Sequence, residues 1–232
     1  MPEGFDRFRD SYETEVQRSI DFAGQDHAFF VEVKAAALLD LVRRRLGDPA
    51  QLAALDVGCG PGTAHRWLAG RFAAFAGTDV SAGLLERARP AFPTVGYRHF
   101  DGRTLPFPGA AFDVVFAVNV FHHVERAEQP ALAAEMARVA KPGGLVALFE
   151  HNPANPLTRR AVRACPFDEG VTLVGPDRAR ELLAGAGLTP VERRYLLFFP
   201  WRGAAWRALE RALARLPLGA QHVAAARKGV AP

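Results

Sequence analysis

The stretch Leu55-Asp56-Val57-Gly58-Cys59-Gly60-Pro61-Gly62 decides how the rest of the chain is interpreted. An apolar run over 52–57 stops abruptly at three alternate glycines, which predicts a buried strand, a tight turn and then a helix over 63–72. Glycine tolerates positive φ and, without a Cβ, lets a ligand approach the backbone. The helix would direct its unpaired N–H groups at the turn. We therefore expect an electron-rich ligand to bind here.

Two kinds of nucleotide ligand use a glycine turn of this type, and the spacing of the glycines separates them. The dinucleotide pattern Gly-x-Gly-x-x-Gly needs a third glycine three residues after Gly60, where this chain has Thr63. Asp56 adds a carboxylate that a pyrophosphate would repel and that the amino group of a methionine would attract. Leu55 to Gly62 resembles the first motif of class I S-adenosylmethionine-dependent methyltransferases.

Acidic residues also follow the next two expected strands. Asp79 comes about 20 residues after the glycines, where an acid holds ribose hydroxyl groups in dinucleotide-binding and methyltransferase folds alike. The resemblance implies that Asp101 receives the adenine amino group, and the alternative is that Asp101 caps a turn with Gly102. Because parallel strands end at one edge of a sheet, Asp56, Asp79 and Asp101 are expected to converge there. The expected cofactor-binding set is Asp56, Gly58, Cys59, Gly60, Gly62, Asp79, Val80, Leu84, Asp101, Gly102 and Asn119.

The remaining elements resemble the same family over nearly the whole chain. Patterning predicts strands over 52–57, 73–78, 95–100, 112–118, 145–149, 191–199 and 221–226. The resemblance implies an α/β fold with a Rossmann-like, seven-stranded and mostly parallel sheet in the order 3-2-1-4-5-7-6, its last strand antiparallel, flanked by helices. Residues 1–47, with helices expected over 11–22 and 25–46, would be a helical lid on a methyltransferase core of residues 48–232. A loop over 150–158 would open a cap-like insertion at about 151–175.

Histidine and tyrosine side chains supply the candidates for proton transfer. His151, in a proline-stiffened polar stretch expected above the transferred methyl group, is the first candidate for a general base, and His122 is the second. The adjacent side chains of His122 and His123 are not expected to point the same way, and their spacing is not a metal signature, so no metal is predicted. Tyr12 and His27, from the lid, complete the catalytic set. For each of these side chains the alternative is a structural role.

Composition bounds the class of protein. Of 232 residues, 49% are hydrophobic and 23% are charged, as in ordinary globular domains. No apolar run approaches the ~20 residues that cross a bilayer, and no targeting peptide is recognised. The two cysteines, Cys59 and Cys165, form no disulfide framework. We expect a cytoplasmic protein that is a monomer or a homodimer.

A small basic excess, 29 Lys and Arg against 25 Asp and Glu, comes largely from arginines in the C-terminal third. Such an excess could attract an acidic substrate, nucleic acid or an anionic membrane, or could be an ordinary solvated surface. An amphipathic helix expected over 200–215 carries arginines beside Trp201 and Trp206. This helix could contact a membrane surface peripherally, pack in the core or form a dimer interface, and the sequence leaves these alternatives open.

The predicted function is transfer of a methyl group from S-adenosylmethionine to a small molecule, such as a natural product, a quinone, a sugar or a lipid-linked intermediate. Three alternatives stay open. An RNA methyltransferase is disfavoured because residues 119–122 lack an Asn-Pro-Pro-Tyr type motif, and an NAD(P)-dependent oxidoreductase because the third glycine is missing. The third is a non-methylating S-adenosylmethionine-binding protein or cyclase. The residues do not choose among oxygen, nitrogen and carbon acceptors.

Overall fold

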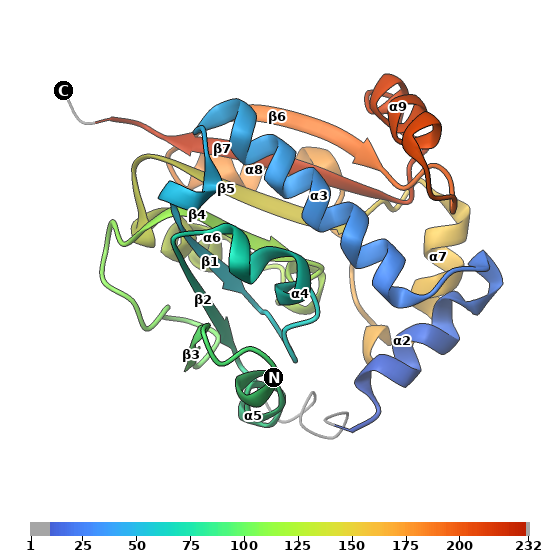
Figure 1. Ribbon diagram of the computed structural model, residues 1–232, viewed down its shortest axis with the longest axis horizontal. Helices are drawn as coiled ribbons and strands as arrows, with labels where there is room; N and C mark the ends of the chain where they lie inside the picture. The colour runs from blue at the N-terminus through green and yellow to red at the C-terminus, as the bar shows by residue number, and fades with distance from the viewer. Residues whose placement is uncertain (1–9, 231–232) are drawn as a thin grey trace.

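The computed structural model describes residues 10–230, which form a seven-stranded mixed sheet flanked by helices (Figure 1). The strands lie in the order β3-β2-β1-β4-β5-β7-β6, with β1 to β5 paired in parallel and β7 antiparallel to both of its neighbours. The predicted fold class, strand order and antiparallel last strand are confirmed. The strands are β1 (Ala53–Val57), β2 (Ala74–Asp79), β3 (Gly96–His99), β4 (Phe112–Val118), β5 (Ala140–His151), β6 (Leu188–Leu196) and β7 (Gln221–Lys228).

The central strands are apolar throughout because both faces of the sheet are covered. Alternate residues point to opposite sides, so Val114 and Phe116 of β4 pack with α3 on one face, and Val115 packs with α6 and α8 on the other. The α-helices in the described residues are α2 (Tyr12–Ile20), α3 (His27–Arg45), α4 (His65–Leu68), α5 (Ala82–Ala91), α6 (Gln129–Val139), α7 (Pro156–Ala164), α8 (Pro176–Gly185) and α9 (Ala204–Leu213).

Several local predictions differ from the structure. Strand β5 begins at Ala140, five residues before the expected start, and β6 begins and ends three residues earlier than expected. The helix after the glycine turn, expected over 63–72, is only the four-residue α4 followed by a 3-10 turn over Ala69–Arg71, because Gly62 still has a positive φ of 80° and delays the start of the helix. The stretch 150–158 is not a loop throughout. Its first two residues end β5, and α7 begins at Pro156 with Asn155 as its N-cap, accepting from the N–H groups of Leu157 and Thr158.

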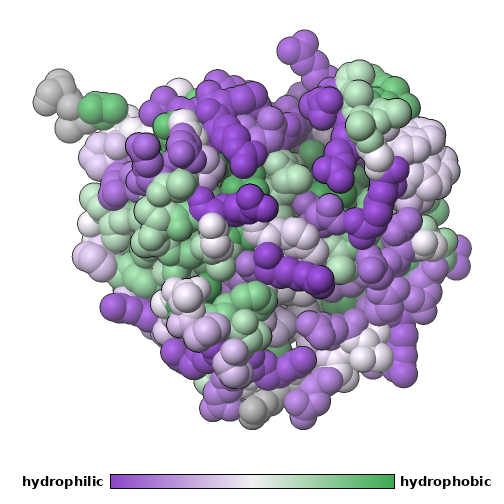
Figure 2. Space-filling view, in the orientation of Figure 1, coloured by the Kyte–Doolittle hydropathy of each residue, from purple (hydrophilic) through white to green (hydrophobic). Residues whose placement is uncertain are grey.

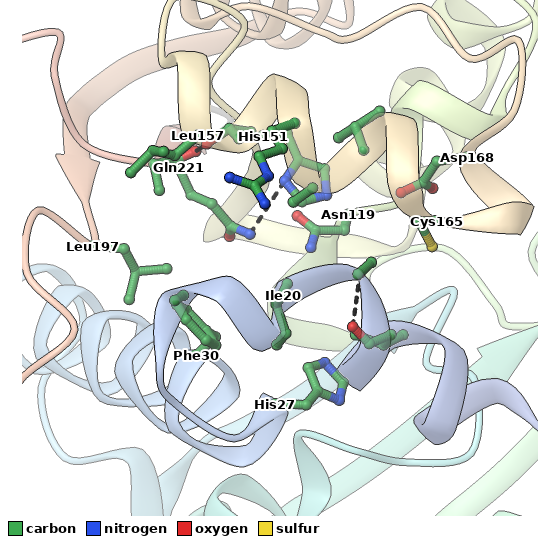
Figure 3. Close-up of a pocket in the computed structure, with 18 of the residues that line it drawn as sticks. Ile20, His27, Phe30, Asn119, His151, Leu157, Cys165, Asp168, Leu197 and Gln221 are labelled. Atoms are coloured by element: carbon green, nitrogen blue, oxygen red, sulfur yellow. Dashed lines mark hydrogen bonds between the residues drawn. The ribbon is translucent and has the colours of Figure 1, made fainter.

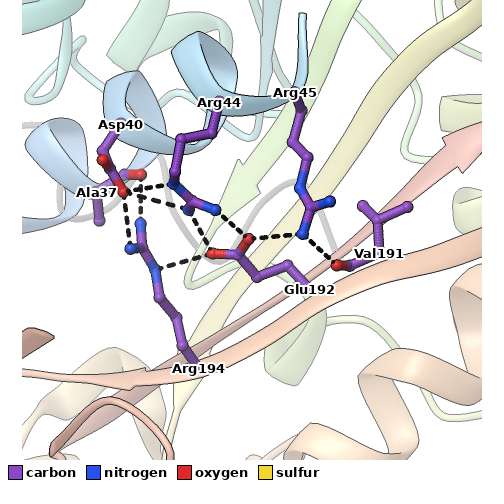
Figure 4. A network of polar contacts seen from close by, with 7 residues as sticks. All are labelled: Ala37, Asp40, Arg44, Arg45, Val191, Glu192 and Arg194. Carbon is purple, nitrogen blue, oxygen red and sulfur yellow. Dashed lines mark hydrogen bonds and ion pairs between the residues drawn. The ribbon is translucent and has the colours of Figure 1, made fainter. Parts of the chain in front are cut away.

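A network of charges ties the N-terminal helix α3 to the edge strand β6 (Figure 4). Both carboxylate oxygens of Glu192 accept from Arg44, at 2.7 and 2.8 Å, and Arg45 donates to Glu192 at 3.3 Å. Arg194 of β6 donates in turn to Asp40, at 2.9 Å. α3 is thereby fixed across the sheet, from beside β4 and β5 to the edge strand.

Helix α9 lies against the end of β6 and buries no residue completely. Its Glu210 accepts from the N–H groups of Leu197, Phe198 and Phe199, which anchors the helix. Figure 2 shows hydrophobic residues at the surface where α9 lies, with hydrophilic residues beside them. No helix within residues 10–230 is both long and apolar enough to cross a membrane.

Candidate functional site

A cavity of about 490 Å³ lies at the edge of the sheet where β4 and β5 end and β7 begins (Figure 3). Helices α2, α3 and α7 and the segment 165–168 supply its other walls. Many of the lining side chains are apolar, including Val16, Ile20, Phe30 and Leu197. All four predicted catalytic side chains line this cavity, namely Tyr12, His27, His122 and His151.

His122 is buried between two carboxylates. Its Nδ1 lies 2.6 Å from Glu150 Oε2, and its Nε2 lies 3.5 Å from Asp168 Oδ1. The other oxygen of Glu150 accepts from the N–H groups of Val120 and Phe121, at 3.0 and 2.7 Å. Burial alone would lower the pKa of His122, but the two carboxylates outweigh burial and raise that pKa to about 9. His122 is therefore a proton donor near neutral pH.

The neighbouring His123 converges on the same carboxylate, contrary to the expectation for adjacent side chains. Its Nε2 lies 3.3 Å from Asp168 Oδ1, and the two imidazole centroids are 4.1 Å apart. Residues 121–123 form a 3-10 turn, in which successive side chains are rotated by about 120° and not opposed as in a strand. Burial and the charge of His122 lower the pKa of His123 to about 3.

His151 occupies the last position of β5 and is neutral. Burial and the nearby His122, whose ring centroid is 5.1 Å away, lower the pKa of His151 to about 3. Its Nδ1 lies 3.4 Å from Gln221 Nε2, and Gln221 Oε1 is buried without a hydrogen bond to the described residues. A side-chain amide can face either way, so Gln221 can hold Nδ1 by donating or by accepting. When Gln221 accepts from Nδ1–H, Nε2 of His151 is free to take a proton.

The N-terminal helices α2 and α3 contribute three titratable side chains to the cavity, Tyr12, His27 and Lys34. Tyr12 stacks on Phe167 with ring centroids 5.1 Å apart, and burial together with Asp79 raises the pKa of its hydroxyl above the usual range. Burial also lowers the pKa of His27 to about 4 and that of Lys34 to about 8. At neutral pH, Tyr12 is therefore a hydroxyl donor and His27 is an uncharged ring.

The glycine turn is built to leave space at its centre. Gly58, Gly60 and Gly62 all have positive φ, and a Cβ on Gly58 would lie only 2.5 Å from the Val120 side chain. A Cβ on Gly60 would meet nothing closer than 4.0 Å. The N–H of Gly60 donates to Asp79 Oδ2 at 2.7 Å, which joins the turn to the end of β2. The open position at Gly60 is where a ligand can approach the backbone.

The second and third strand-end acids are held in different ways. Asp79 is buried, also accepts from the N–H of Ser81 at 2.8 Å, and has its pKa raised by burial to about 6. Asp101 is exposed and accepts from the N–H groups of Thr104 and Arg103, both at 2.9 Å, which hold its pKa below the usual range. The turn-capping role considered for Asp101 is therefore present in the structure.

The first strand-end acid faces inward. Asp56 Oδ2 lies 3.2 Å from His65 Nε2, and Nδ1 of that ring lies 2.6 Å from the Tyr97 hydroxyl. Asp56 Oδ1 has no hydrogen-bond partner among the described residues, and burial raises the pKa of the carboxyl. The thiol of Cys59 also points into the core, against Gly77. Asp79 is thus the last residue of β2, while Asp56 is the last but one of β1 and Asp101 follows the end of β3 by two residues, and Asp56 is already paired within the protein.

The other expected cofactor residues include one that also lines the cavity. Leu84 is buried and is the side chain nearest to the space above Gly60, and Val80 lies beside Gly102. Asn119, at the end of β4, has a left-handed backbone with φ 57°. Its Oδ1 is buried without a hydrogen bond among the described residues, and the residue lines the cavity. Asn119 therefore offers an acceptor for a ligand donor.

Sequence reasoning missed four polar side chains of this site: Lys34, Glu150, Asp168 and Gln221. Glu150 and Asp168 lie 28 and 46 residues after their shared partner His122 in the chain, so their pairing depends on the fold. The sequence did hold a signal for Glu150. An acid that directly follows an apolar strand must either pair with another polar group or lie at the edge of the sheet where the strands end. Lys34 stands within the apolar pattern of α3 and gave no comparable signal.

Comparisons with known proteins agree with this geometry. Residues 55–148 match a family described as a methyltransferase domain. The trans-aconitate 2-methyltransferase of Azoarcus sp. (strain BH72) is 31% identical over 165 residues, which are 70% of this chain and 63% of that protein. The 27-O-demethylrifamycin SV methyltransferase of Amycolatopsis mediterranei (strain S699) is 33% identical over 148 residues, which are 59% of this chain and 53% of that protein. The chain thus spans less than two thirds of the length of these curated relatives.

A solved S-adenosylmethionine-dependent methyltransferase from Thermotoga maritima shares the fold across nearly the whole chain. The TM-score is 0.68 at 19% identity, over 98% of this chain and 100% of that chain. The strand order with its antiparallel last strand is therefore a fold that this chain shares with that solved structure, and ligands of such open α/β sheets bind at the carboxyl ends of the strands. Together, the fold and the match of residues 55–148 identify a methyltransferase domain in this part of the chain.

Proposed function

We propose that the protein transfers a methyl group from S-adenosylmethionine to a small molecule bound in the cavity of about 490 Å³. The observation that carries the proposal is the position of Asn119, which directly follows β4 and lines the cavity, while the next residue, Val120, lies against Gly58 of the glycine turn. A ligand on the turn and a ligand in the cavity would therefore meet at this residue. The named activities of the two curated relatives, on aconitate and a rifamycin, agree with a small-molecule acceptor.

The residues at the turn fit the cofactor. The space above Gly60 admits an adenosyl group, the Asp79 carboxylate accepts from ribose hydroxyls, and Asn119 Oδ1 accepts from the methionine amino group. S-adenosylmethionine, when bound, supplies an activated methyl group on a sulfonium and leaves as S-adenosylhomocysteine. Asp56 would act indirectly in this arrangement, by holding His65 beside the turn.

The cavity fits an acceptor with a largely apolar body and an anionic or polar group, and an acceptor oxygen is one such group. Phe30, Leu197 and Phe198 offer apolar contacts, while Lys34 and Arg160 offer positive charge to an anionic or polar group. The acceptor oxygen forms the new bond to the methyl carbon, and the electron pair of the broken bond remains on the sulfur. His151 Nε2 takes the acceptor proton, and Gln221 positions the ring through Nδ1.

The N-terminal region and the cap-like insertion serve as the cover of this site in our proposal. Within the lid of residues 1–47, positions 1–9 lie outside the described residues, while α2 and α3 line the cavity. Tyr12 of α2 stacks on Phe167 of the insertion, so the two covers meet. A closed cover would exclude water and hold the reacting atoms in line, which is worth about 7–11 kcal/mol in favourable cases.

Calorimetry tests cofactor binding directly. S-adenosylhomocysteine should bind the full chain with one site, and NAD should not. Replacing Gly60 with Ala should weaken S-adenosylhomocysteine binding, because a Cβ would enter the open space at a positive φ. Binding of NAD without binding of S-adenosylhomocysteine would overturn the proposal.

A turnover assay tests the role of His151. His151→Ala should leave the affinity for S-adenosylhomocysteine nearly unchanged and slow formation of S-adenosylhomocysteine with an oxygen acceptor by at least about tenfold. The control is His99→Gln, because His99 is exposed and lies outside the cavity. Unchanged turnover in His151→Ala would remove His151 from the mechanism.

A further inference from the structure

We propose that His122, His123 and Asp168 form a binding site for one divalent transition-metal ion of the Zn²⁺ type at the wall of the cavity. The proposal deepens the proposed function, but metal binding itself does not depend on it. The sequence predicted no metal, because the spacing of two adjacent histidines is not a metal signature. The third residue comes from another segment, 45 positions after His123, and only the fold brings it to the pair.

The donor atoms are already close enough to share one ion. One donor atom from each side chain lies within 4.8 Å of the other two. Asp168 Oδ1 is 3.5 Å from His122 Nε2 and 3.3 Å from His123 Nε2. Bonds of about 2.0–2.1 Å to a tetrahedral ion place neighbouring ligand atoms about 3.3 Å apart. Two of the three separations therefore match such a site without movement of the chain.

The second nitrogen of His122 has the partner that a metal-bound histidine needs. Nδ1 lies 2.6 Å from Glu150 Oε2, so Nδ1–H donates to that carboxylate and Nε2 is directed at Asp168. Metal-binding histidines usually donate their other N–H to a carboxylate or a carbonyl in this way. Glu150 is held in turn by the N–H groups of Val120 and Phe121. The orientation of His122 is thus fixed from outside the proposed site.

The type and number of ligands indicate the kind of ion. Two imidazoles and one carboxylate suit Zn²⁺ and its neighbours better than Mg²⁺ or Ca²⁺, which prefer oxygen ligands. Three protein ligands leave a fourth position for water or a substrate atom. Because His122, His123 and Asp168 all line the cavity, that position would face the acceptor.

The charges around the cluster also suit a cation. The carboxylates of Glu150 and Asp168 flank His122, with oxygens 2.6 Å from its Nδ1 and 3.5 Å from its Nε2. A cation bound between His122 and Asp168 would therefore lie close to two carboxylates. An acceptor oxygen bound to the ion would lose its proton more readily, since a bound divalent ion lowers the pKa of a coordinated hydroxyl group.

The test measures metal binding by the full chain, without a histidine tag and after treatment with a chelator. Titration with Co²⁺, followed by visible absorption, and with Zn²⁺, followed by calorimetry, should show one ion per chain. His123→Gln and Asp168→Ala should each weaken binding at least about tenfold. The matched control is His27→Gln, which alters a cavity histidine outside the cluster and should leave binding unchanged.

Two results would overturn the metal site: no bound ion in the wild-type chain, or equal affinity in the wild type and in His123→Gln. Thermal unfolding of each metal-free variant shows whether it is folded. If Asp168→Ala is not folded, the test uses His123→Gln, because the side chain of His123 is less buried. S-adenosylhomocysteine binding is measured on the same samples. A chain that binds S-adenosylhomocysteine but no metal contradicts only the metal site, and a chain that binds only metal contradicts only the proposed function.

Discussion

Asp79 gives the site a dependence on pH that can be measured through cofactor affinity. Burial raises the pKa of Asp79 to about 6, so the carboxylate is ionised only as the pH rises through that value. Ribose hydroxyls donate to the ionised form. We expect S-adenosylhomocysteine affinity to be constant above about pH 7 and to fall as the pH drops through 6, approaching tenfold per unit well below the pKa. Calorimetry between about pH 5 and pH 8 checks this.

Asp79→Asn is the control for that titration. It keeps one oxygen that can accept from the N–H of Gly60 but has no carboxyl proton to gain near pH 6. Its affinity should be lower than that of the wild type at pH 7 and should change much less with pH. Equal pH dependence in both proteins would mean that another group titrates.

At the residue scale, the sequence predicts where the acids lie more reliably than what they contact. Asp56, Asp79 and Asp101 all lie within two residues of the carboxyl ends of adjacent parallel strands, because an apolar run followed by an acid marks the region of a strand end. The inward turn of Asp56 could not be predicted, since it depends on His65 from α4 and on Tyr97 from β3. The same holds for Asp168, whose partners are two residues of a different segment.

Glu150 controls the junction between β5 and the turn after β4. Its fully buried carboxylate accepts from Val120 N–H, Phe121 N–H and His122 Nδ1–H. Glu150→Ala would leave these donors buried and unpaired, and we expect the free energy of unfolding to fall by about 3–5 kcal/mol. Urea denaturation at neutral pH measures the loss.

The comparison for Glu150 is Glu181→Ala on α8. The Glu181 side chain is 66% exposed, and its only ion pair among the described residues is a 3.8 Å contact with Arg178. Its removal should change stability by less than about 0.5 kcal/mol. A similar loss in both variants would show that Glu150 has no special part in stability.

At the element scale, the strands were predicted well and the segments after β1 and β5 were not. The central strands are covered on both faces, so their sequences are continuously apolar and easy to recognise. In the stretch 150–158, two prolines and two asparagines suggested a loop. Asn155-Pro156 is instead a helix start, since Asn caps the first turn and Pro suits its first position.

At the scale of the whole molecule, Glu192 joins helix α3 to the edge strand β6, which are far apart in the sequence. Glu192 on β6 pairs with Arg44, Arg45 and Arg194, so Glu192→Ala would leave three neighbouring positive charges without it. We expect a loss of about 1–3 kcal/mol in the free energy of unfolding. Part of this effect should decrease in high salt, because the network is partly exposed.

Asp177→Ala is the matched control for Glu192→Ala. Asp177 pairs with Arg193 at 2.8 Å, but its side chain is 78% exposed, and such pairs contribute about 0–1 kcal/mol. Denaturant unfolding of both variants at low and high salt separates a connecting network from an ordinary surface pair. Equal losses in the two variants would contradict the special role of Glu192.

The position of β7 has a consequence for how the protein is made. Among residues 10–230, β7 is the last strand along the chain, yet it lies between β5 and β6, and its first residue, Gln221, pairs with His151 of β5 at the wall of the cavity. During synthesis this strand leaves the ribosome after β1 to β6. Until then, the backbone groups of β5 and β6 that pair with β7 have no partner strand. The nascent chain can therefore complete the cavity only after residue 228, the last residue of β7, has been synthesised.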